Sequence, residues 1–268
     1  MAEFQKPDAS LPSGPPGPAT DFLRLSDFAF ERAILEIRYP NAFELWDRSG
    51  ALWIAALQKW NDLQVVSAEP SRTVFRGKQF ELSTELQAAR IVQHNPVLPL
   101  ADFTGFAKEF VELVSGTLSL SVLSRVGLRL TFFRRVADRA SETSALLRTG
   151  LLKPVQPGLF GIEGEPVSMD YRARWEGKGL GVTLRLGHED RAFTMQGPAE
   201  LAGFLREKGL EEQITFAGLV LDVDFYTPTS IQVSQLGVAP WIRQHVKTLK
   251  EDAEALFTAV DLPGMGVR

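Results

Sequence analysis

Three segments that alternate between apolar and polar residues each carry a pair of charged side chains. The pairs are Glu36 with Arg38, Arg125 with Arg129, and Asp222 with Asp224. Residues an even number of positions apart on a strand share one face, so the members of each pair point the same way. If the three strands are neighbours, opposite charges lie about 4.5–5.5 Å apart and pair across the sheet. These six residues are the candidate cluster: either a structural ladder of ion pairs or a polar groove that binds a ligand or a peptide.

Other chemistry finds little support in the residue types. Asp222 and Asp224 could offer oxygen ligands to a hard cation, but two carboxylates are too few for a site. The chain has no cysteine and only three histidines, which stand far apart, and it lacks the zinc, calcium and phosphate-loop motifs. We therefore predict no catalytic residue, no metal and no cofactor. An enzyme stays open as an alternative, with Arg129 orienting an anionic substrate and Asp222 or Asp224 as acid or base.

Composition bounds the class of protein. Of 268 residues, 44% are hydrophobic and 23% are charged, which is ordinary for a globular chain and excludes collagen-like, coiled-coil or mainly disordered proteins. The net charge of −4 gives no overall basic excess to attract nucleic acid or anionic membranes. No secretory signal and no apolar run of about 18 residues is present, so we expect a cytoplasmic protein with no membrane partner.

Hydrophobic periodicity predicts the order of the elements. In the first half we expect a strand near 33–39, a helix near 43–61 and a second helix after an antiparallel meander, before the long strand Ser124–Val136. The meander strands are Leu63–Ser67, Arg72–Arg76 and Phe80–His94, and the second helix is Asp102–Leu118. The second half predicts helix Asp138–Arg148, hairpin Val167–Trp175 and Leu180–Leu186, a short strand Phe193–Gln196, helix Pro198–Lys208, strand Ile214–Tyr226 and helix Pro240–Val260.

This order predicts an α+β fold. Strands do not alternate regularly with single helices, which favours mainly antiparallel sheets with amphipathic helices packed on one face. The two halves have a similar plan, so two similar α+β subdomains are a further hypothesis. The predicted boundaries are a disordered Pro/Gly-rich tail at 1–20, an N-terminal subdomain at 21–152, a connector at 153–166, and a C-terminal subdomain at 167–268 that ends in a long helix.

Three motifs together carry a resemblance to a known family. They are the early strand LEIRYP, the middle strand VGLRLTFFRRV and the late strand LDVDFY followed by a long C-terminal helix. From about Phe28 to Gly264 the chain resembles a family of sporadically distributed bacterial proteins of uncharacterised function. Gly127, Leu128 and Arg129 match the family's middle strand, with Leu130 where the family usually has an aromatic residue. The resemblance implies a fold, a bacterial source and a defence-like genomic neighbourhood, but no activity.

Three functions remain in contention. The leading hypothesis is a non-enzymatic binding or protein-interaction module of a defence-like or accessory complex. Its partner would be another protein or a second copy of the chain, which we expect to pack through the last helix or through Trp46, Trp53 and Trp60. The first alternative is an enzyme or small-ligand-binding protein that uses the charged sheet face. The second is a nucleic-acid-binding accessory protein, which the net charge disfavours.

Overall fold

The computed structural model describes residues 23–40, 42–69, 71–94, 100–136, 143, 146–147, 151, 169–194 and 213–258. The predicted tail at 1–20, the connector at 153–166 and the helix Pro198–Lys208 lie outside the described residues, as does most of Asp138–Arg148. The predicted division into two subdomains therefore stays a prediction.

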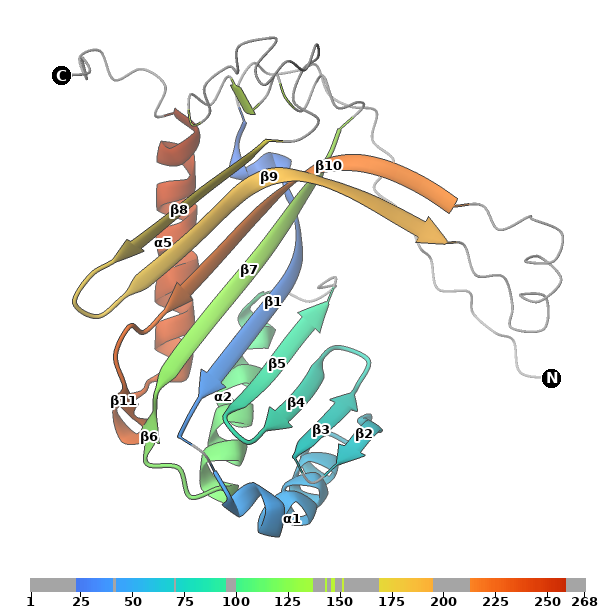
Figure 1. The fold of residues 1–268 in the computed structure, drawn as a ribbon, viewed down its shortest axis with the longest axis vertical. Helices are drawn as coiled ribbons and strands as arrows, with labels where there is room; N and C mark the ends of the chain where they lie inside the picture. Colours follow the sequence, from blue (N-terminus) through green and yellow to red (C-terminus); the bar gives the residue numbers. More distant parts are fainter. Residues whose placement is uncertain are drawn as a thin grey trace, which may run out of the picture.

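One antiparallel sheet of nine strands dominates the fold (Figure 1). Its strands lie in the order β2-β3-β4-β5-β1-β7-β10-β9-β8. Their bounds are β1 Ala29–Arg38, β2 Gln64–Glu69, β3 Arg72–Arg76, β4 Glu81–Glu85, β5 Ala88–His94, β7 Arg125–Arg135, β8 Asp170–Glu176, β9 Gly181–Thr194 and β10 Gln213–Tyr226. The short strands β6 (Val122–Leu123) and β11 (Ile231–Gln232) form a second, two-stranded sheet. The predicted α+β class with antiparallel sheets is confirmed.

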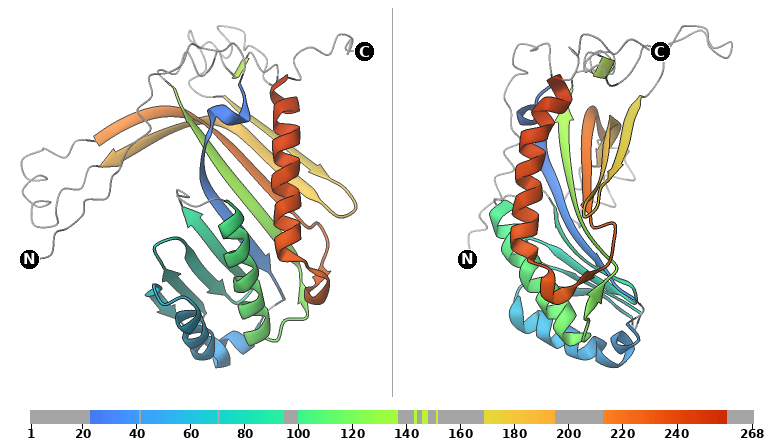
Figure 2. Two further views of the ribbon diagram at one scale, coloured as in Figure 1. Left: turned by 180° about the vertical axis from the view of Figure 1, so that it is seen from behind. Right: turned by 90° about the vertical axis from the view of Figure 1, so that its left-hand side faces the viewer.

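In the described part of the chain, three long helices cover one face of this sheet, as predicted. They are α1 (Glu44–Lys59), α2 (Leu100–Thr117) and α5 (Val238–Thr258), and Figure 2 shows α2 and α5 packed along the same side. Among the described residues, no helix is long and apolar enough to cross a membrane.

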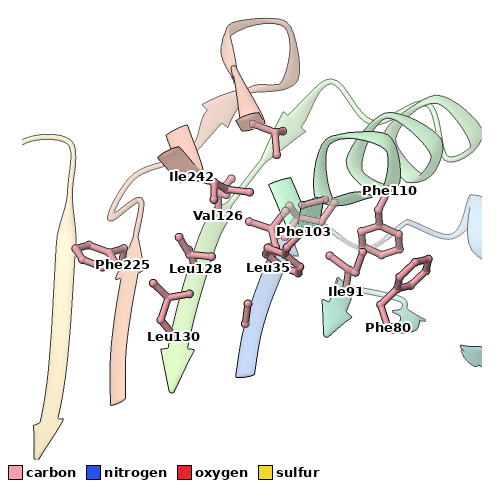
Figure 3. Close-up of a cluster of buried hydrophobic side chains, with 14 of the residues drawn as sticks. Leu35, Phe80, Ile91, Phe103, Phe110, Val126, Leu128, Leu130, Phe225 and Ile242 are labelled. Atoms are coloured by element: carbon pink, nitrogen blue, oxygen red, sulfur yellow. The ribbon is translucent and has the colours of Figure 1, made fainter. Parts of the chain in front are cut away.

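The alternation of the strands decides which face the helices cover. On β1, Ala33, Leu35 and Ile37 are fully buried, whereas Glu36 between them points to the opposite face. The same rule buries Leu128 on β7, and Figure 3 shows these apolar side chains meeting residues of α2 and α5. The apolar half of each strand therefore faces the core and leaves the polar half outside.

Two details differ from the sequence-based expectation. The expected strand Phe80–His94 is two strands, β4 and β5, because Tyr39 holds the turn between them. Its hydroxyl donates to the carbonyl oxygens of Glu85 at 2.7 Å and Ala88 at 3.0 Å. The expected separate strand Phe193–Gln196 was also wrong. Its described residues, Phe193 and Thr194, are the end of β9, which pairs with the long strand β10 without interruption from Gly181 to Thr194.

The two halves of the sheet repeat one order of strands. β1 and β7 form the central antiparallel pair, and the meander β5-β4-β3 extends from β1 as β10-β9-β8 extends from β7. A long helix follows the last strand of each set, α2 after β5 and α5 after β10. Strands from both sides of the predicted connector thus lie in one continuous sheet, which brings the three charged segments together at its centre.

Candidate functional site: a charged groove on the open face of the sheet

The six residues of the candidate cluster lie on three adjacent strands, β1, β7 and β10. All six point away from the helices, on the face that the apolar residues of the same strands leave polar. In the register of the sheet, Glu36 on β1 lies opposite Gly127 on β7, and Arg129 lies opposite Asp224 on β10. The structure therefore brings all six together, although only some of the ion pairs follow the direct register.

Glu36 is the centre of the cluster. Its carboxylate accepts hydrogen bonds from Arg38 Nε at 2.6 Å, Arg90 Nε at 2.5 Å and Arg125 Nη1 at 3.2 Å. The Glu36 side chain is only 14% exposed. Burial raises the pKa of this carboxyl, but the hydrogen bonds and charges of Arg90 and Arg38 outweigh burial and hold the pKa below its ordinary value. Glu36 is thus ionised at neutral pH and fixes three guanidinium groups.

Arg125 bridges two strands across a glycine. Its guanidinium lies over Gly127 and binds Glu36 on one side and Asp224 on the other, with Nη2 2.5 Å from Asp224 Oδ2. A Cβ at position 127 would lie 3.4 Å from Arg125 and from Asp224, so both side chains pack directly over this glycine. Burial raises the pKa of Asp224, an effect that Arg125 offsets only in part.

Arg129 and Asp222 form a two-pronged ion pair. Arg129 Nε is 2.8 Å from Asp222 Oδ1, and Nη2 is 2.5 Å from Oδ2. The pair is diagonal between β7 and β10, because in the register Asp222 lies opposite Thr131, which is two residues from Arg129. The hydrogen bond to Asp222 raises the pKa of Arg129 despite burial, which acts in the opposite direction. Two N–H groups of the guanidinium thus face the two carboxylate oxygens, which is the strongest form of ion pair that arginine makes.

Tyr226 closes one end of the charged face. Its ring lies between the guanidinium groups of Arg125 and Arg174, 4.8 Å and 5.5 Å from the ring centre. The Tyr226 hydroxyl donates to Glu176 at 2.7 Å and accepts from Arg174 Nε at 2.8 Å. The ring covers Gly181 so closely that a Cβ there would lie 2.2 Å away. Tyr226 therefore contacts both arginines with its ring and also accepts a hydrogen bond from Arg174.

The charged face is hollowed into a groove of about 730 Å³, which we call the arginine groove. Seven arginines line it, against three carboxylates. The arginines are Arg32, Arg38, Arg72, Arg90, Arg125, Arg129 and Arg174, and the carboxylates are Glu36, Glu81 and Asp224. Asp222 binds Arg129 from beside the lining. Glu85 and Glu176 likewise pair with Arg72 and Arg174 from beside the lining. The seven arginines thus face six carboxylates, which leaves a small excess of positive charge in a chain that carries −4.

Arg32 is the lining arginine with a buried donor that has no partner among the described residues. It lies on β1 opposite His94 of β5, and both residues line the groove. This donor is the Arg32 Nε. A buried donor without a partner is uncommon in folded proteins and costs free energy.

Sequence reasoning missed the arginines that complete the groove. Arg90 lies directly opposite Glu36 in the register of β5 and β1. In the sequence, Arg90, Val92 and His94 alternate with the buried residues Ala89 and Ile91. This alternation indicates that Arg90 lies on the polar face of the sheet. Treating Phe80–His94 as one strand concealed that signal, because the turn at residues 86–87 was not placed.

The arrangement suits anion binding better than acid–base chemistry. Asp222 and Asp224 are both occupied by arginines, and an arginine side chain cannot give up its proton at ordinary pH. Within the described part of the chain, no group of three or more His, Asp or Glu side chains is placed to hold a metal ion.

Comparison with known proteins adds no family. No protein-family model matches the chain, and no curated protein matches it. Among solved structures, an acetoacetate decarboxylase-like enzyme from Sphingomonas wittichii RW1 is 11% identical over 77% of this chain and 91% of its own, with a TM-score of 0.09. A TM-score that low carries no argument about fold or function. The family resemblance in the sequence stays a prediction.

Proposed function

We propose that the protein is a non-enzymatic binding module whose arginine groove holds a small polyanion, a ligand that carries two or more phosphate or carboxylate groups. Two hypotheses from the sequence are combined here: a non-enzymatic binding module, and a small ligand bound by the charged face of the sheet. The observation that carries it is Arg32, whose buried Nε has no partner among the described residues and lies in a groove already rich in arginine.

The excess of guanidinium groups supports an anionic ligand. Each guanidinium has five N–H donors in a planar fork that matches phosphate and carboxylate oxygens. Glu36 accepts hydrogen bonds from Nε of Arg38 and of Arg90, and in the described part of the chain only Nη1 of Arg90 has a further carboxylate nearby, that of Glu85 at 3.8 Å. The carboxylates thus hold the arginines in fixed positions without using all their donors, which lowers the entropy lost when a ligand binds.

The size of the groove favours a small ligand over nucleic acid. Its volume of about 730 Å³ lies within the roughly 300–1,000 Å³ of small-molecule sites. Outside the groove the charges are mixed, and arginines such as Arg172 and Arg191 pair with neighbouring carboxylates. A long basic track for a phosphate backbone would need a continuous excess of positive charge.

Titration calorimetry with tripolyphosphate and citrate tests the proposal on the full chain. We expect at least one of the two to bind in the micromolar range at low salt and to bind more weakly as salt rises. Arg32→Gln should weaken binding about tenfold, since it removes one charge-assisted contact. Arg172→Gln is the matched control: this arginine is 70% exposed on the same sheet, is paired to Asp170 and does not line the groove.

The two ligands separate phosphate from carboxylate recognition. Failure of both to bind at about 1 mM and low salt contradicts the proposal, as does an equal loss in Arg32→Gln and Arg172→Gln. If a single-stranded oligonucleotide binds far more tightly than tripolyphosphate, the result favours a nucleic-acid-binding protein over a module for small polyanions.

A further inference from the structure

Helix α1 is apolar on two opposite sides. Its inner side packs within the chain, where Leu45, Leu52 and Ala56 are buried. Trp53 belongs to that side and donates from its ring nitrogen to Thr73 at 2.7 Å, and Trp60 at the end of the helix is 7% exposed. The inner side accounts for two of the three tryptophans that the sequence suggested as an interaction surface.

The outer side carries a second apolar stripe, which includes the third tryptophan. Phe43 is 58% exposed, Trp46 52%, Ile54 59% and Leu57 37%. At about 100° per residue these side chains fall within an arc of about 80°. We call them, with Gly50 between them, the outer stripe. Clustered large apolar side chains of this kind mark interaction sites more often than isolated ones do.

The outer stripe is symmetric about Gly50. Phe43 and Trp46 precede this glycine by seven and four residues, and Ile54 and Leu57 follow it by four and seven. A Cβ built on Gly50 would meet nothing within 4 Å, so nothing inside the described chain requires glycine there. Glycine in the middle of a helix lowers its stability, which makes its presence at the centre of an exposed stripe informative.

We infer that the outer stripe is a homodimer interface, in which the α1 helices of two copies cross antiparallel at Gly50. A two-fold axis through the two glycines places Phe43 and Trp46 of one copy against Leu57 and Ile54 of the other. Such an interface uses the same surface on both subunits, which requires the self-complementary spacing that the stripe has. The two glycines let the helix backbones approach closely, as small residues do at other helix crossings.

The area of the stripe sets the expected strength. Two half-exposed aromatic and two aliphatic side chains offer roughly 400 Å² per copy, hence about 800 Å² in the dimer from the stripe alone. This total lies below the roughly 1,200–2,000 Å² of stable specific interfaces and in the range of weak, transient ones, so we expect a dimer that dissociates at tens of micromolar.

The solvent-facing side of the last helix offers little apolar surface to a second copy. Its apolar side chains Ile242, Leu249, Ala253 and Phe257 are buried in this chain, as the predicted packing on an apolar partner requires. Its exposed side carries mainly charged and polar residues, among them Arg243, Lys247, Lys250 and Glu251. Because α1 lies on the helical side of the sheet, a dimer through it leaves the arginine groove open (Figure 2).

A glycine substitution separates dimerisation from folding. Gly50→Gln introduces a better helix former into open space, so the monomer should keep or raise its melting temperature. The same side chain blocks the helix crossing, so sedimentation equilibrium of the full chain from about 1 to about 100 μM should change from a monomer–dimer equilibrium to monomer. Gly105→Gln on α2 is the matched control, because this exposed helical glycine also has open space but lies in no apolar stripe.

Introduced cysteines test the geometry, and the chain has no cysteine of its own. In the antiparallel arrangement Gly50→Cys lies on the two-fold axis. The cysteine side chain is much smaller than that of glutamine, and a disulfide needs the close approach of about 5.5 Å between Cα atoms that the crossing provides, so this variant should form a covalent dimer on oxidation. Ile54→Cys should not, because its two copies would lie about 12 Å apart along the helix axis, beyond the reach of a disulfide. A wild-type chain that is monomeric at about 100 μM overturns the inference. Equal cross-linking at both positions, which a parallel pair would give, overturns it too.

Discussion

The two faces of the nine-stranded sheet differ in what they do for the molecule. Leu128 and Arg129 are neighbours on β7, yet Leu128 is fully buried under the helices and Arg129 is 48% exposed on the open face. The apolar face gains its free energy from removing surface from water, whereas the polar face holds charges that pair at modest gain. Fold specificity should therefore come from the apolar face, and the polar face is free to carry a binding site.

The largest effect is expected on the apolar face. Leu128→Ala should lower the free energy of unfolding by about 2–5 kcal/mol, because it removes buried methyl groups and leaves a cavity. Arg129→Gln, one residue away, should lower it by only about 1 kcal/mol. Urea unfolding of the two variants measures both values, and similar losses in the two would remove the distinction between the faces.

A smaller effect is expected at Glu36. Glu36→Gln should lower the free energy of unfolding by about 1–3 kcal/mol at pH 7, since it removes the shared acceptor of three arginines. Folding lowers the pKa of Glu36. The contribution of this carboxylate to the free energy of unfolding is therefore fully present above the pKa of the unfolded chain, near 4.3, and is lost as pH falls through the lower pKa of the folded chain. The difference between wild type and variant should thus narrow below about pH 4, and a constant difference in urea titrations across pH argues against this role.

His245 on α5 gives the apolar face its own dependence on pH. Its ring stacks on Phe225 at 5.0 Å and meets Trp241 edge-on at 4.4 Å, and burial lowers its pKa. The stability it contributes is present above the unfolded pKa of about 6.5 and is lost as pH falls, because the unfolded chain takes up the proton more readily. His245→Phe should therefore flatten the fall in melting temperature between about pH 7 and pH 5. If the melting temperature falls equally steeply with pH in wild type and His245→Phe, groups other than His245 cause the fall.

The smallest effect is the coupling of one ion pair on the open face. A double-mutant cycle of Arg129→Gln and Asp222→Asn should give a coupling of about 0.5–1 kcal/mol at low salt, less at high salt. Coupling above about 3 kcal/mol would mean that the polar face stabilises the fold as strongly as the core does.

Sequence periodicity predicted the centre of the candidate site because β1, β7 and β10 are long strands with clear alternation. Glu36, Arg125 and Asp224 needed only the assumption that these strands are neighbours. Arg32 and Arg174 could not be assigned, because their place in the groove depends on strand order and on the curvature of the sheet. The diagonal pairing of Arg129 with Asp222 rather than Asp224 also depends on side-chain geometry, which the register alone does not give.

Glu36→Gln tests the proposed binding of a polyanion by the open face most directly, because the substitution should change stability and binding in opposite directions. The variant loses stability, yet it removes a negative charge from the middle of the arginine groove. The amide that replaces the carboxylate still accepts hydrogen bonds, so the arginines lose only part of their support, and the removed negative charge is the larger effect. Calorimetric titration with tripolyphosphate should therefore show binding about tenfold tighter than in wild type, with Glu109→Gln on the helical side, which makes the same change in net charge, unaffected. Unchanged or weaker binding by a folded Glu36→Gln protein would contradict the claim.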